Sequence, residues 1–338
     1  MQIKDVIDKK QWEDFVQARP EANFLQSWQW GEFHKNRGKR IFRRGLYNDD
    51  QLIGVYTGQI GNARRGKRLE IAGGPLIDWS DKQVVKITTE DIKKQTKIAN
   101  AVFARIRPQE PYSDKMAEIL KDNDYKKAPM YLSVELAGVL DLTKNEEEIL
   151  KGMRQRLRRA LRKAAKNKIT VETSTNPNDI DAFYDIQLQT AKRQEFVAFS
   201  KEFFKKQFKA FSDDDQVILY TAKLNDEILA QNFMLFYGNE ASYHYGVSTE
   251  LGTRLSGAPL LHMRAMEDAR KKGIKRYNFW GIVDEDDTEH RFYGVSVFKR
   301  GFGVDELQYT PAHDLVVNSK KYAGTWLIET ARRKVRKV

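Results

Sequence analysis

The residue types present narrow the chemistry that this sequence can perform. Its 338 residues include no cysteine, which excludes disulfides, thiolate nucleophiles and cysteine-bound zinc. Its five histidines are scattered, and no two of them have a metal-ligand spacing such as HxxxH. No Ser-His-Asp signature is visible either. We therefore expect neither a metal site nor a cofactor, although carboxylates can also ligate metals.

Basic residues are concentrated in two segments of the chain, whose formal net charge is +12. Residues 154–168, RQRLRRALRKAAKNK, carry eight lysines or arginines and no acidic residue, and the last eight residues, ARRKVRKV, carry five. Such density favours a polyanionic partner such as RNA, or an anionic membrane surface. The first segment is equally well explained as the solvated face of a helix.

Length and hydrophobic patterning predict two domains without a membrane anchor. A chain of 338 residues suits two domains of roughly 150 residues each. Apolar runs such as 227–238 are much shorter than the ~20 residues of a membrane-spanning helix. The N-terminus lacks the apolar stretch of a secretory signal. We expect a cytoplasmic protein.

The first part of the chain alternates between helical and extended patterns. Thr-Thr-Glu-Asp opens the helical spacing over 88–104 and reads as a helix start. The turn NDD between two extended runs suits a hairpin. The expected elements are helices over 8–19, up to Gly38 and over 88–104, and strands over 40–48, 51–60, 69–78 and 103–108.

A second unit is expected to begin near residue 139. After a short strand, Thr143 and Glu146 have the spacing of a capping box at a helix start. Apolar residues then recur every three or four positions up to Ala164, which predicts a stripe packed against the domain. The remaining expected elements are helices over 178–193 and 200–211, a hairpin over 216–238, a strand over 240–248, then a loop, a helix ending at Gly273 and the strand 276–281.

The order of elements from 217 to 281 resembles the core of GNAT acyltransferases. Those enzymes hold a pyrophosphate with backbone amides of a loop of pattern [RQ]-x-x-G-x-[GA] and the helix that follows it. Here the corresponding stretch is RLSGAP, residues 254–259. Pro259 has no N–H to donate and suits the first turn of a helix. The loop thus supports the fold but argues against CoA as donor. The N-terminal half resembles a second copy without such a loop.

Several motifs together resemble the Fem aminoacyltransferases, in their shorter FemX-like form. They are FLQSWQWGEF at 24–33, IAGGPLIDW at 71–79, DLTKNEEEILKGMRQRLRRALRKAAKNKITVE at 141–172 and FWGIVDEDDTEHRFYGVSVFKRGFG at 279–303. The resemblance implies an α/β (α+β) fold of two GNAT-like domains, the second interrupting the first, with no coiled-coil arm. Residues 1–138 plus 311–338 would form the precursor-binding domain, and 139–310 the aminoacyl-tRNA domain.

The reaction that the resemblance implies is aminoacyl transfer in cell-wall biogenesis. An amine on the stem peptide of a peptidoglycan precursor attacks the ester that joins an amino acid to tRNA, which requires positioning and a cation where negative charge develops. Lys299 matches the family's catalytic lysine, Phe298 an aromatic that lines the tRNA acceptor end, and Tyr245 a substrate-contacting tyrosine. The alternative for Lys299 is a surface lysine on a strand. The alternative for Tyr245 is a strand tyrosine that packs on one face of the sheet. The expected tRNA-binding residues are Arg154, Arg158, Arg159 and Arg162.

Three positions depart from the family pattern and leave the acceptor open. A phosphate-binding lysine falls on His34, with Lys35 adjacent. An arginine for the precursor's phosphates falls near Phe199, so that Arg193 or Lys201 would have to serve. An acidic position falls on Arg107. The acceptor is a UDP-linked or lipid-linked muropeptide precursor, and the amino acid is Gly, Ala or Ser.

Other functions compete with this interpretation. An acetyl-CoA-dependent GNAT N-acetyltransferase would use the altered loop. A non-catalytic RNA-binding protein would use the basic helix, although aromatic residues do not interleave with the basic runs. An aminoacyltransferase acting on membrane lipids is a third alternative, and the basic tail can lie on an anionic membrane. We expect a monomer.

Overall fold

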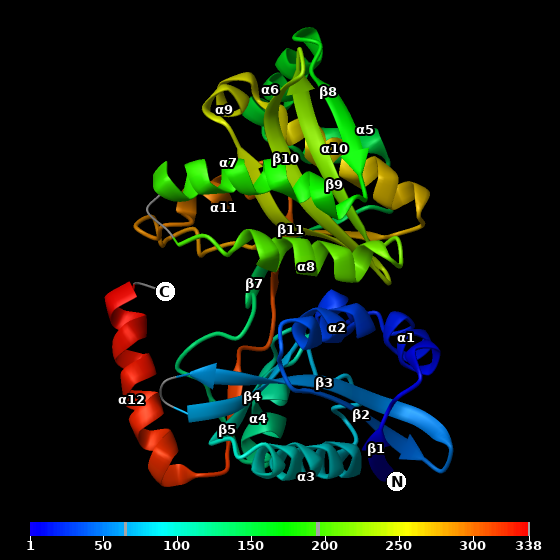
Figure 1. The fold of residues 1–338 in the computed structure, drawn as a ribbon, viewed down its shortest axis with the longest axis vertical. Helices are drawn as coiled ribbons and strands as arrows, with labels where there is room; N and C mark the ends of the chain where they lie inside the picture. Colours follow the sequence, from blue (N-terminus) through cyan, green and yellow to red (C-terminus); the bar gives the residue numbers. More distant parts are fainter. Residues whose placement is uncertain (64–65, 194–196, 337–338) are drawn as a thin grey trace. The chain divides into compact units, whose positions relative to one another are not determined.

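The chain folds into two compact units, and the computed structural model describes residues 1–63, 66–193 and 197–336. The first unit comprises residues 1–136 and 307–338, and the second comprises residues 137–306. Each is built on a seven-stranded sheet (Figure 1). The second unit is therefore inserted into the chain of the first.

The sheet of the first unit has the order β1-β2-β3-β4-β5-β14-β6. Adjacent strands in this sheet are antiparallel, except that β4 and β5 are parallel and are joined through a helix. The strands are β1 (Gln2–Asp5), β2 (Ile41–Asn48), β3 (Gln51–Ala63), β4 (Gly66–Ala72), β5 (Phe103–Arg107), β6 (Tyr125–Lys127) and β14 (His313–Val316).

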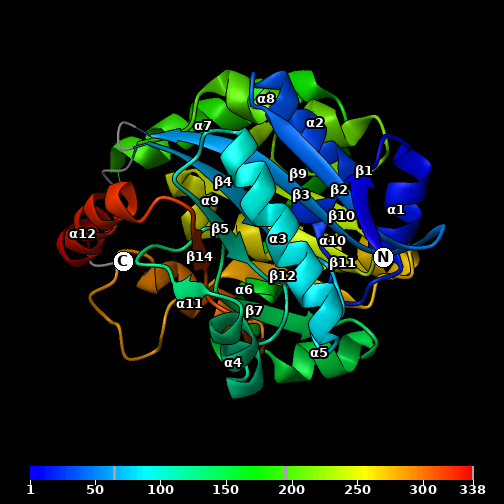
Figure 2. The same cartoon turned by 90° about the horizontal axis from the view of Figure 1, so that it is seen from below.

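Helices cover both faces of this sheet. Figure 1 shows α1 (Lys9–Gln17) and α2 (Trp28–Asn36) on one face, and Figure 2 shows α3 (Lys82–Ile98) running across the other. A short 3-10 turn, η1 (Phe24–Gln26), precedes α2, and α4 (Asp114–Asp122) precedes β6. The core between α3 and the sheet is aliphatic and aromatic, with Leu69, Ile71, Ile92, Ala104 and Ile106 fully buried.

The expected bounds of two elements in this unit were wrong. Helix α3 begins at Lys82 rather than at residue 88, because the Asp81 side chain accepts hydrogen bonds from the backbone N–H groups of Gln83 and Val84 and so caps the helix earlier. Thr88 lies buried inside the helix, which also ends at Ile98 rather than at residue 104. Strand β4 ends at Ala72, where Gly73 turns into the left-handed region (φ +72°).

A buried ionic cluster ties the end of the chain to the first unit. Helix α12 (Ser319–Arg336) follows β14. The Arg105 guanidinium on β5 donates to both carboxylate oxygens of Asp314, at 2.7 and 2.8 Å, and to Oε2 of Glu329 at 2.7 Å. Tyr322 also donates to Asp314, at 2.9 Å. Strand β14 and helix α12 are therefore fixed to β5 by charge.

The sheet of the second unit has the order β13-β7-β12-β11-β10-β9-β8. Its strands β8 to β11 form an antiparallel run, whereas β11 and β12 are parallel. The β9–β10 turn places Asn225 and Asp226 at positive φ, as a tight hairpin turn requires. The strands are β7 (Leu136–Asp141), β8 (Thr170–Ser174), β9 (Val217–Leu224), β10 (Glu227–Tyr237), β11 (Glu240–Ser248), β12 (Arg276–Gly281) and β13 (Asp305–Gln308).

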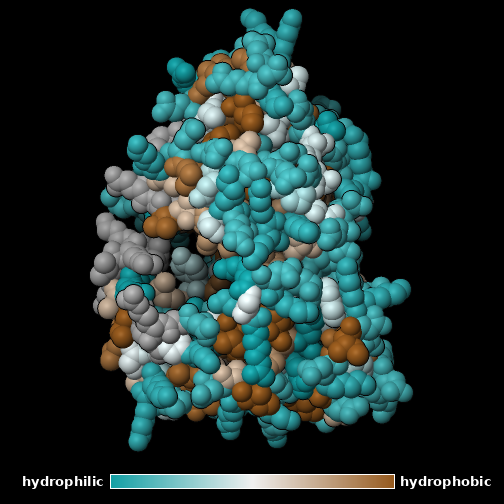
Figure 3. Space-filling view, in the orientation of Figure 1, coloured by the Kyte–Doolittle hydropathy of each residue, from teal (hydrophilic) through white to brown (hydrophobic). Residues whose placement is uncertain are grey.

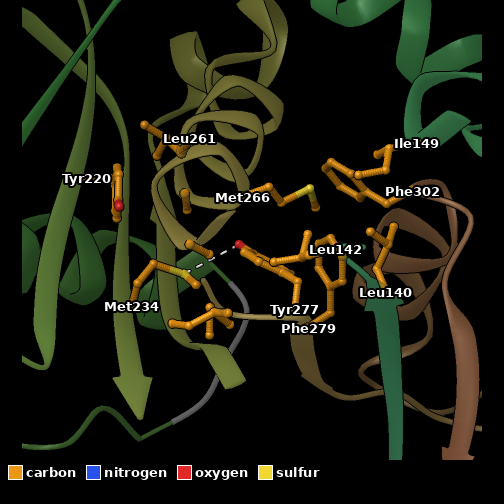
Figure 4. Packing of buried hydrophobic residues seen from close by; sticks show 14 of the residues in the cluster. Leu140, Leu142, Ile149, Tyr220, Met234, Leu261, Met266, Tyr277, Phe279 and Phe302 are labelled. Atoms are coloured by element: carbon orange, nitrogen blue, oxygen red, sulfur yellow. Dashed lines mark hydrogen bonds between the residues drawn. The ribbon is translucent and has the colours of Figure 1, made fainter. Parts of the chain in front are cut away.

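The helices of the second unit also cover both faces of its sheet. In Figure 1, α7 (Ile180–Arg193) and α8 (Lys201–Ser212) lie in front of the sheet, and α6 (Gln155–Lys166) and α10 (Gly257–Lys271) lie behind it. The buried cluster on the α10 side joins residues of five strands, including Leu140, Met234 and Tyr277, to Phe302 (Figure 4).

The expected capping box was displaced by two residues. Asn145, rather than Thr143, caps α5 (Glu146–Gly152), and Glu148 returns the bond to the Asn145 N–H. Thr143 instead donates its hydroxyl to Asp141. The basic segment does not continue α5, because Met153 adopts an extended conformation (ψ 146°) and α6 starts after it.

The described helices are short. The longest of them is α12 with 18 residues, so the described residues contain no helical-hairpin arm. None of the helices traced in the structure is both long and apolar enough to cross a lipid bilayer.

Arg105→Met is expected to destabilise the first unit by roughly 3–5 kcal/mol, because it leaves two buried carboxylates without their cation. Urea unfolding would measure the loss. Lys93→Met is a matched control, since Lys93 pairs with the exposed Asp124 and such pairs contribute at most about 1 kcal/mol. Equal effects of the two substitutions would contradict the role of Arg105.

Candidate active site

The second unit opens where two parallel strands separate. Residues Glu240–Ser242 of β11 pair with Arg276–Asn278 of β12, and the pairing stops there. Strand β12 stays beside β7 through an irregularity between Asn278 and Gly281. Within it Trp280 adopts a left-handed backbone (φ +64°), and its N–H donates to Asn278 Oδ1 at 2.8 Å. A large residue with positive φ is costly and marks functional sites.

Lys299 lies beside the point where these strands separate. It lies on α11 (Tyr293–Arg300), and its Nζ donates to the carbonyl oxygen of Gly281 at 2.6 Å. The side chain is buried, and burial lowers the pKa of Lys299 to about 7. The alternative of a surface lysine on a strand is therefore wrong. A buried lysine of this kind can hold or release a proton near neutral pH.

The segment KRGFG, which begins with Lys299, packs against the end of β12. The Arg300 guanidinium donates to the Val283 carbonyl at 2.7 Å, and Phe302 is fully buried in the core. Gly303 has φ +76°, and a Cβ there would lie 2.5 Å from the Gly152 carbonyl oxygen. Glycine is required at that position because the backbone passes so close. The motif thereby fixes where Lys299 emerges.

Aromatic and histidine side chains surround the lysine. Its Nζ lies 5.7 Å from the centre of the Tyr243 ring. The His262 ring packs 4.5 Å from that of Tyr243, and its Nδ1 lies 2.8 Å from the Tyr277 hydroxyl. Burial, with the charge of Lys299 second, lowers the pKa of His262 to about 3, so the imidazole is neutral. Phe298, also on α11, packs 5.6 Å from His262.

Tyr245 lies on the other face of β11. The register of β10 and β11 shifts between Phe233, which lies opposite Tyr245, and Met234, which lies opposite Tyr243, and Tyr243 and Tyr245 face opposite sides of the sheet. Tyr245 packs 5.1 Å from Phe204 of α8 and 5.6 Å from Phe233. Lys299 is thus grouped with Tyr243, whereas Tyr245 belongs to an aromatic cluster on the α8 side.

That aromatic cluster has an exposed edge. Phe199 is 53% exposed and stacks on Phe203 with ring centres 4.2 Å apart. His244 connects the cluster to the open strand end, because its ring packs 5.7 Å from Trp280. The cluster thus offers flat apolar surface beside the opening.

The expected phosphate-binding residues of the second unit are only partly described. Arg193 ends α7, but its side chain lies outside the described residues. Lys201 is partly exposed and forms an ion pair with Asp181 at 3.0 Å. That bond raises the pKa of Lys201, so the side chain stays charged.

In the first unit, the expected residues occupy different surroundings. His34 is buried among Trp30 and Phe33, and burial lowers its pKa to about 3. A neutral, enclosed ring is a poor phosphate ligand. Lys35 is exposed and lies 3.7 Å from Glu32. Arg107 is fully buried, and its Nε donates to Ser133 Oγ at 2.6 Å.

The basic residues of α6 differ in their exposure. Arg159 and Arg162 are exposed on the helix surface. Arg154 is exposed and lies 3.7 Å from Glu285. Arg158 is half-buried and donates to the Lys151 carbonyl at 3.2 Å, at the end of α5. Leu157 and Ala164 bury the opposite side of the helix. Arg158 therefore has a structural contact, whereas Arg159 and Arg162 are available to a polyanion.

The stretch compared with a phosphate-binding loop is partly helical, contrary to expectation. Helix α9 (Glu250–Leu255) fills it because Thr249 caps its first turn. Ser256 then turns left-handed, and α10 starts at Gly257 with Pro259 buried in its first turn. The start of α10 thus lacks one of the backbone donors that a pyrophosphate would use.

Sequence reasoning identified Lys299 but missed the residues that hold it in place. Tyr243 on β11 and His262 on α10 are remote from Lys299 in the sequence, whereas Trp280 and Gly281 end β12. Trp280 and Gly281 fall within the motif FWGIVDEDD, but nothing in their residue types signals a left-handed bend or a carbonyl acceptor.

Comparison with known proteins places these features in a family. Residues 151–299 match an acetyltransferase (GNAT) domain, and residues 7–130 match the FemAB family. The chain is 22% identical to a lipid II:glycine glycyltransferase of Staphylococcus haemolyticus (strain JCSC1435), over 98% of this chain and 96% of that protein. The Staphylococcus aureus (strain MRSA252) protein of the same name is 21% identical over the same shares.

The same fold occurs in solved structures. The crystal structure of FemX matches with a TM-score of 0.86 and 20% identity, covering 97% of this chain and all (100%) of that one. The C-terminal domain of a putative lysylphosphatidylglycerol synthetase from Agrobacterium fabrum matches with a TM-score of 0.58 and 15% identity, covering 96% and 95%.

The acetyltransferase (GNAT) match of the second unit places the chain among the acyltransferases. The chain belongs to the FemAB family and is an aminoacyltransferase with a FemX-like fold.

Lys299→Met is expected to stabilise the folded protein, most strongly at low pH. The pKa of Lys299 falls from an ordinary 10.5 to about 7 on folding, so between these values the unfolded chain binds more protons. The loss of folding free energy caused by burying the charged Lys299 is complete below pH 7 and disappears as the pH rises to 10.5. Thermal unfolding should show a gain on the order of a few kcal/mol at pH 6 and a smaller one at pH 9.5.

The exposed Lys271→Met is the control, because Lys271 pairs with Glu267 at the surface. A gain from Lys299→Met that does not change with pH would show that Lys299 is not held with a depressed pKa.

Proposed function

We propose that this protein transfers glycine, alanine or serine from aminoacyl-tRNA to a stem-peptide amine of a peptidoglycan precursor. The observation that carries the proposal is the buried Lys299 on the Gly281 carbonyl, where β11 and β12 separate. Family membership and the names of the full-length relatives support it, because those relatives are lipid II:glycine glycyltransferases. A lipid-linked acceptor is therefore the first to test, and a UDP-linked precursor is the second.

The chemistry needs little beyond positioning and charge. A neutral amine of the acceptor attacks the ester carbonyl carbon, and the carbonyl oxygen becomes an oxyanion. The intermediate then collapses: the ester C–O bond breaks, the ribose oxygen leaves and takes a proton, and the new amide nitrogen loses one. The products are an amide and free tRNA, and no other reactant is consumed.

Lys299 suits the developing charge in this reaction. As an ammonium it would donate to the oxyanion or to the leaving ribose oxygen, which stabilises the transition state more than the ground state. The Gly281 carbonyl directs Nζ toward the opening, and Tyr243 supports the same group from its ring face. Because burial brings its pKa close to neutral, the same group can give a proton to the leaving oxygen.

The donor is proposed to approach through the second unit. The exposed arginines of α6 would contact phosphates of the tRNA, and the aromatic edge of Phe199 and Phe203 would lie beside its unpaired 3′ end. Bases of single-stranded ends stack readily on such rings. The acceptor's phosphates would use Lys35, Arg193 or Lys201. The buried, neutral His34 does not favour a phosphate role.

A transfer assay tests the proposal. Purified protein is mixed with tRNA charged with labelled glycine, alanine or serine and with lipid-linked or UDP-linked precursor, and labelled acetyl-CoA is supplied in parallel. We expect label to pass from tRNA to a precursor, and Lys299→Met to lower kcat by about 100-fold or more. Lys271→Met should leave the rate unchanged. Label from acetyl-CoA alone would instead favour an N-acetyltransferase.

The pH profile separates catalysis from support of the fold. If the ammonium is required, kcat/KM should decline as pH rises through about 7, the pKa of Lys299. In Lys299→Arg the guanidinium stays charged, so any remaining activity should lose this alkaline decline. An unchanged decline in the arginine variant would assign it to another group.

The α6 surface provides a separate test of tRNA binding. Replacing Arg159 and Arg162 together by glutamine should weaken tRNA binding and reduce its salt dependence. With fewer phosphate contacts, binding releases fewer counterions from the tRNA. Lys82→Gln with Lys86→Gln, on the exposed surface of α3, removes the same charge elsewhere. Filter binding over a salt series would show identical slopes for the two variants if α6 is only a solvated face.

A further inference from the structure

Helix α12 presents its apolar residues away from the unit to which it belongs. Its buried positions are Tyr322, Thr325 and Glu329, spaced at three and four residues, and two of them make the ionic and hydrogen-bonded contacts with Asp314 and Arg105. The ring of Tyr322 also packs against Phe103 of β5, so the remaining apolar side chains of α12 are not needed to hold it in place. This reverses the usual arrangement of a surface helix.

The outward side of α12 is apolar for more than two turns. Ala323, Leu327 and Ala331 follow one another at four-residue spacing and are all exposed. Trp326, Leu327 and Ile328 are 42%, 63% and 44% exposed. Figure 3 shows hydrophobic side chains gathered at the edge of the molecule where α12 lies in Figure 1. Adjacent exposed Trp, Leu and Ile side chains form an apolar patch rather than isolated residues.

Positive charge flanks this patch at both ends of the helix. Lys320 and Lys321 are exposed in its first turn, and Arg332 and Arg333 are exposed near its end. The sequence adds Lys334, Arg336 and Lys337 beyond them, and no acidic residue follows Glu329. The apolar patch is therefore bordered by cations, which is the charge pattern of segments that lie in the interface of an anionic bilayer.

We propose that α12 docks the protein on an anionic lipid surface, with Trp326 and Leu327 inserted at the headgroup level and the lysines and arginines on the phosphates. Trp is suited to this depth because its ring is apolar while its N–H remains near water. RNA would use the same cations but gains less from exposed Leu327 and Ile328. A second copy of the chain would carry the same positive charges and be repelled by them.

This surface goes beyond the proposed reaction, since binding to lipid needs neither donor nor acceptor. Glu329 and Tyr322 keep α12 fixed to β5 and β14, so the helix is presented as a formed surface. Ordering entropy is then not added to the cost of docking.

Vesicle binding tests the proposal with the full-length protein. Co-sedimentation is measured with vesicles of phosphatidylglycerol and phosphatidylcholine, and with phosphatidylcholine alone. We expect binding to the anionic vesicles that falls with salt, and at least a tenfold loss in the variant carrying Trp326→Ser and Leu327→Ser. A control variant with Ile98→Ser and Leu188→Ser removes apolar side chains of similar exposure, 52% and 45%, from other helices, and should bind normally.

Two further readouts distinguish the alternatives. Trp326→Phe should keep vesicle binding but lose part of the fluorescence quenching by lipids with brominated acyl chains, which locates this side chain in the bilayer. Transfer to a water-soluble UDP-linked acceptor should be unchanged in the serine variant, so failure of docking and failure of the proposed reaction are separable. Unaltered vesicle binding by the serine variant would overturn the proposal. A lack of vesicle binding by the unmodified protein would overturn it too. If the serine variant then changed tRNA binding, or self-association in gel filtration, the patch would be assigned to RNA or to a second copy of the chain instead.

Discussion

The hydrogen bond from Lys299 to the Gly281 carbonyl depends on the separation of two strands. In a continuous parallel sheet that carbonyl would be occupied by its neighbour, since backbone acceptors inside sheets are paired. The left-handed bend at Trp280 takes β12 away from β11 while β7 stays beside it. The freed carbonyl then receives the ammonium. The strain at one residue thus provides both the opening and the group that orients the lysine within it.

The two units use one topology for different purposes. In each, an antiparallel run is followed by a helix and a parallel strand, formed by β4, α3 and β5 in the first unit and by β11, α10 and β12 in the second. In the first unit β4 and β5 pair over five residues from Arg68 to Ala72, and charge is buried in closed ion pairs around Arg105. In the second the strands pair over only three residues, and the buried Lys299 ammonium donates to the Gly281 carbonyl. A buried ion that is paired supports the fold, whereas one held by a carbonyl is poised for chemistry.

The last helix links the architecture to the cell-wall setting of the proposed reaction. Its inner side carries the acid and hydroxyl that bind β5 and β14, and its outer side carries apolar and basic residues. A precursor that is lipid-linked is confined to a membrane surface, and a docked enzyme would meet it by two-dimensional diffusion. The proposed docking helix and the proposed acceptor are therefore compatible, although each is tested separately.

The sequence determined the mixed α/β fold and most strands, because alternating and helical hydrophobic periods are local properties. The two acyltransferase units followed from its resemblance to a known family. It also singled out Lys299, through the motif around it. Helix starts were less determined, since Asp81 and Asn145 compete with other capping residues nearby and only the packed helix selects among them. The surroundings of Lys299 were decided by tertiary structure alone: Tyr243 comes from β11, His262 from α10, and Trp280 and Gly281 from β12. Burial, which brings the pKa of Lys299 near neutral, is a property of their packing. His34 shows the same limit, because its burial beside Trp30 and Phe33, which lowers its pKa, is decided by packing.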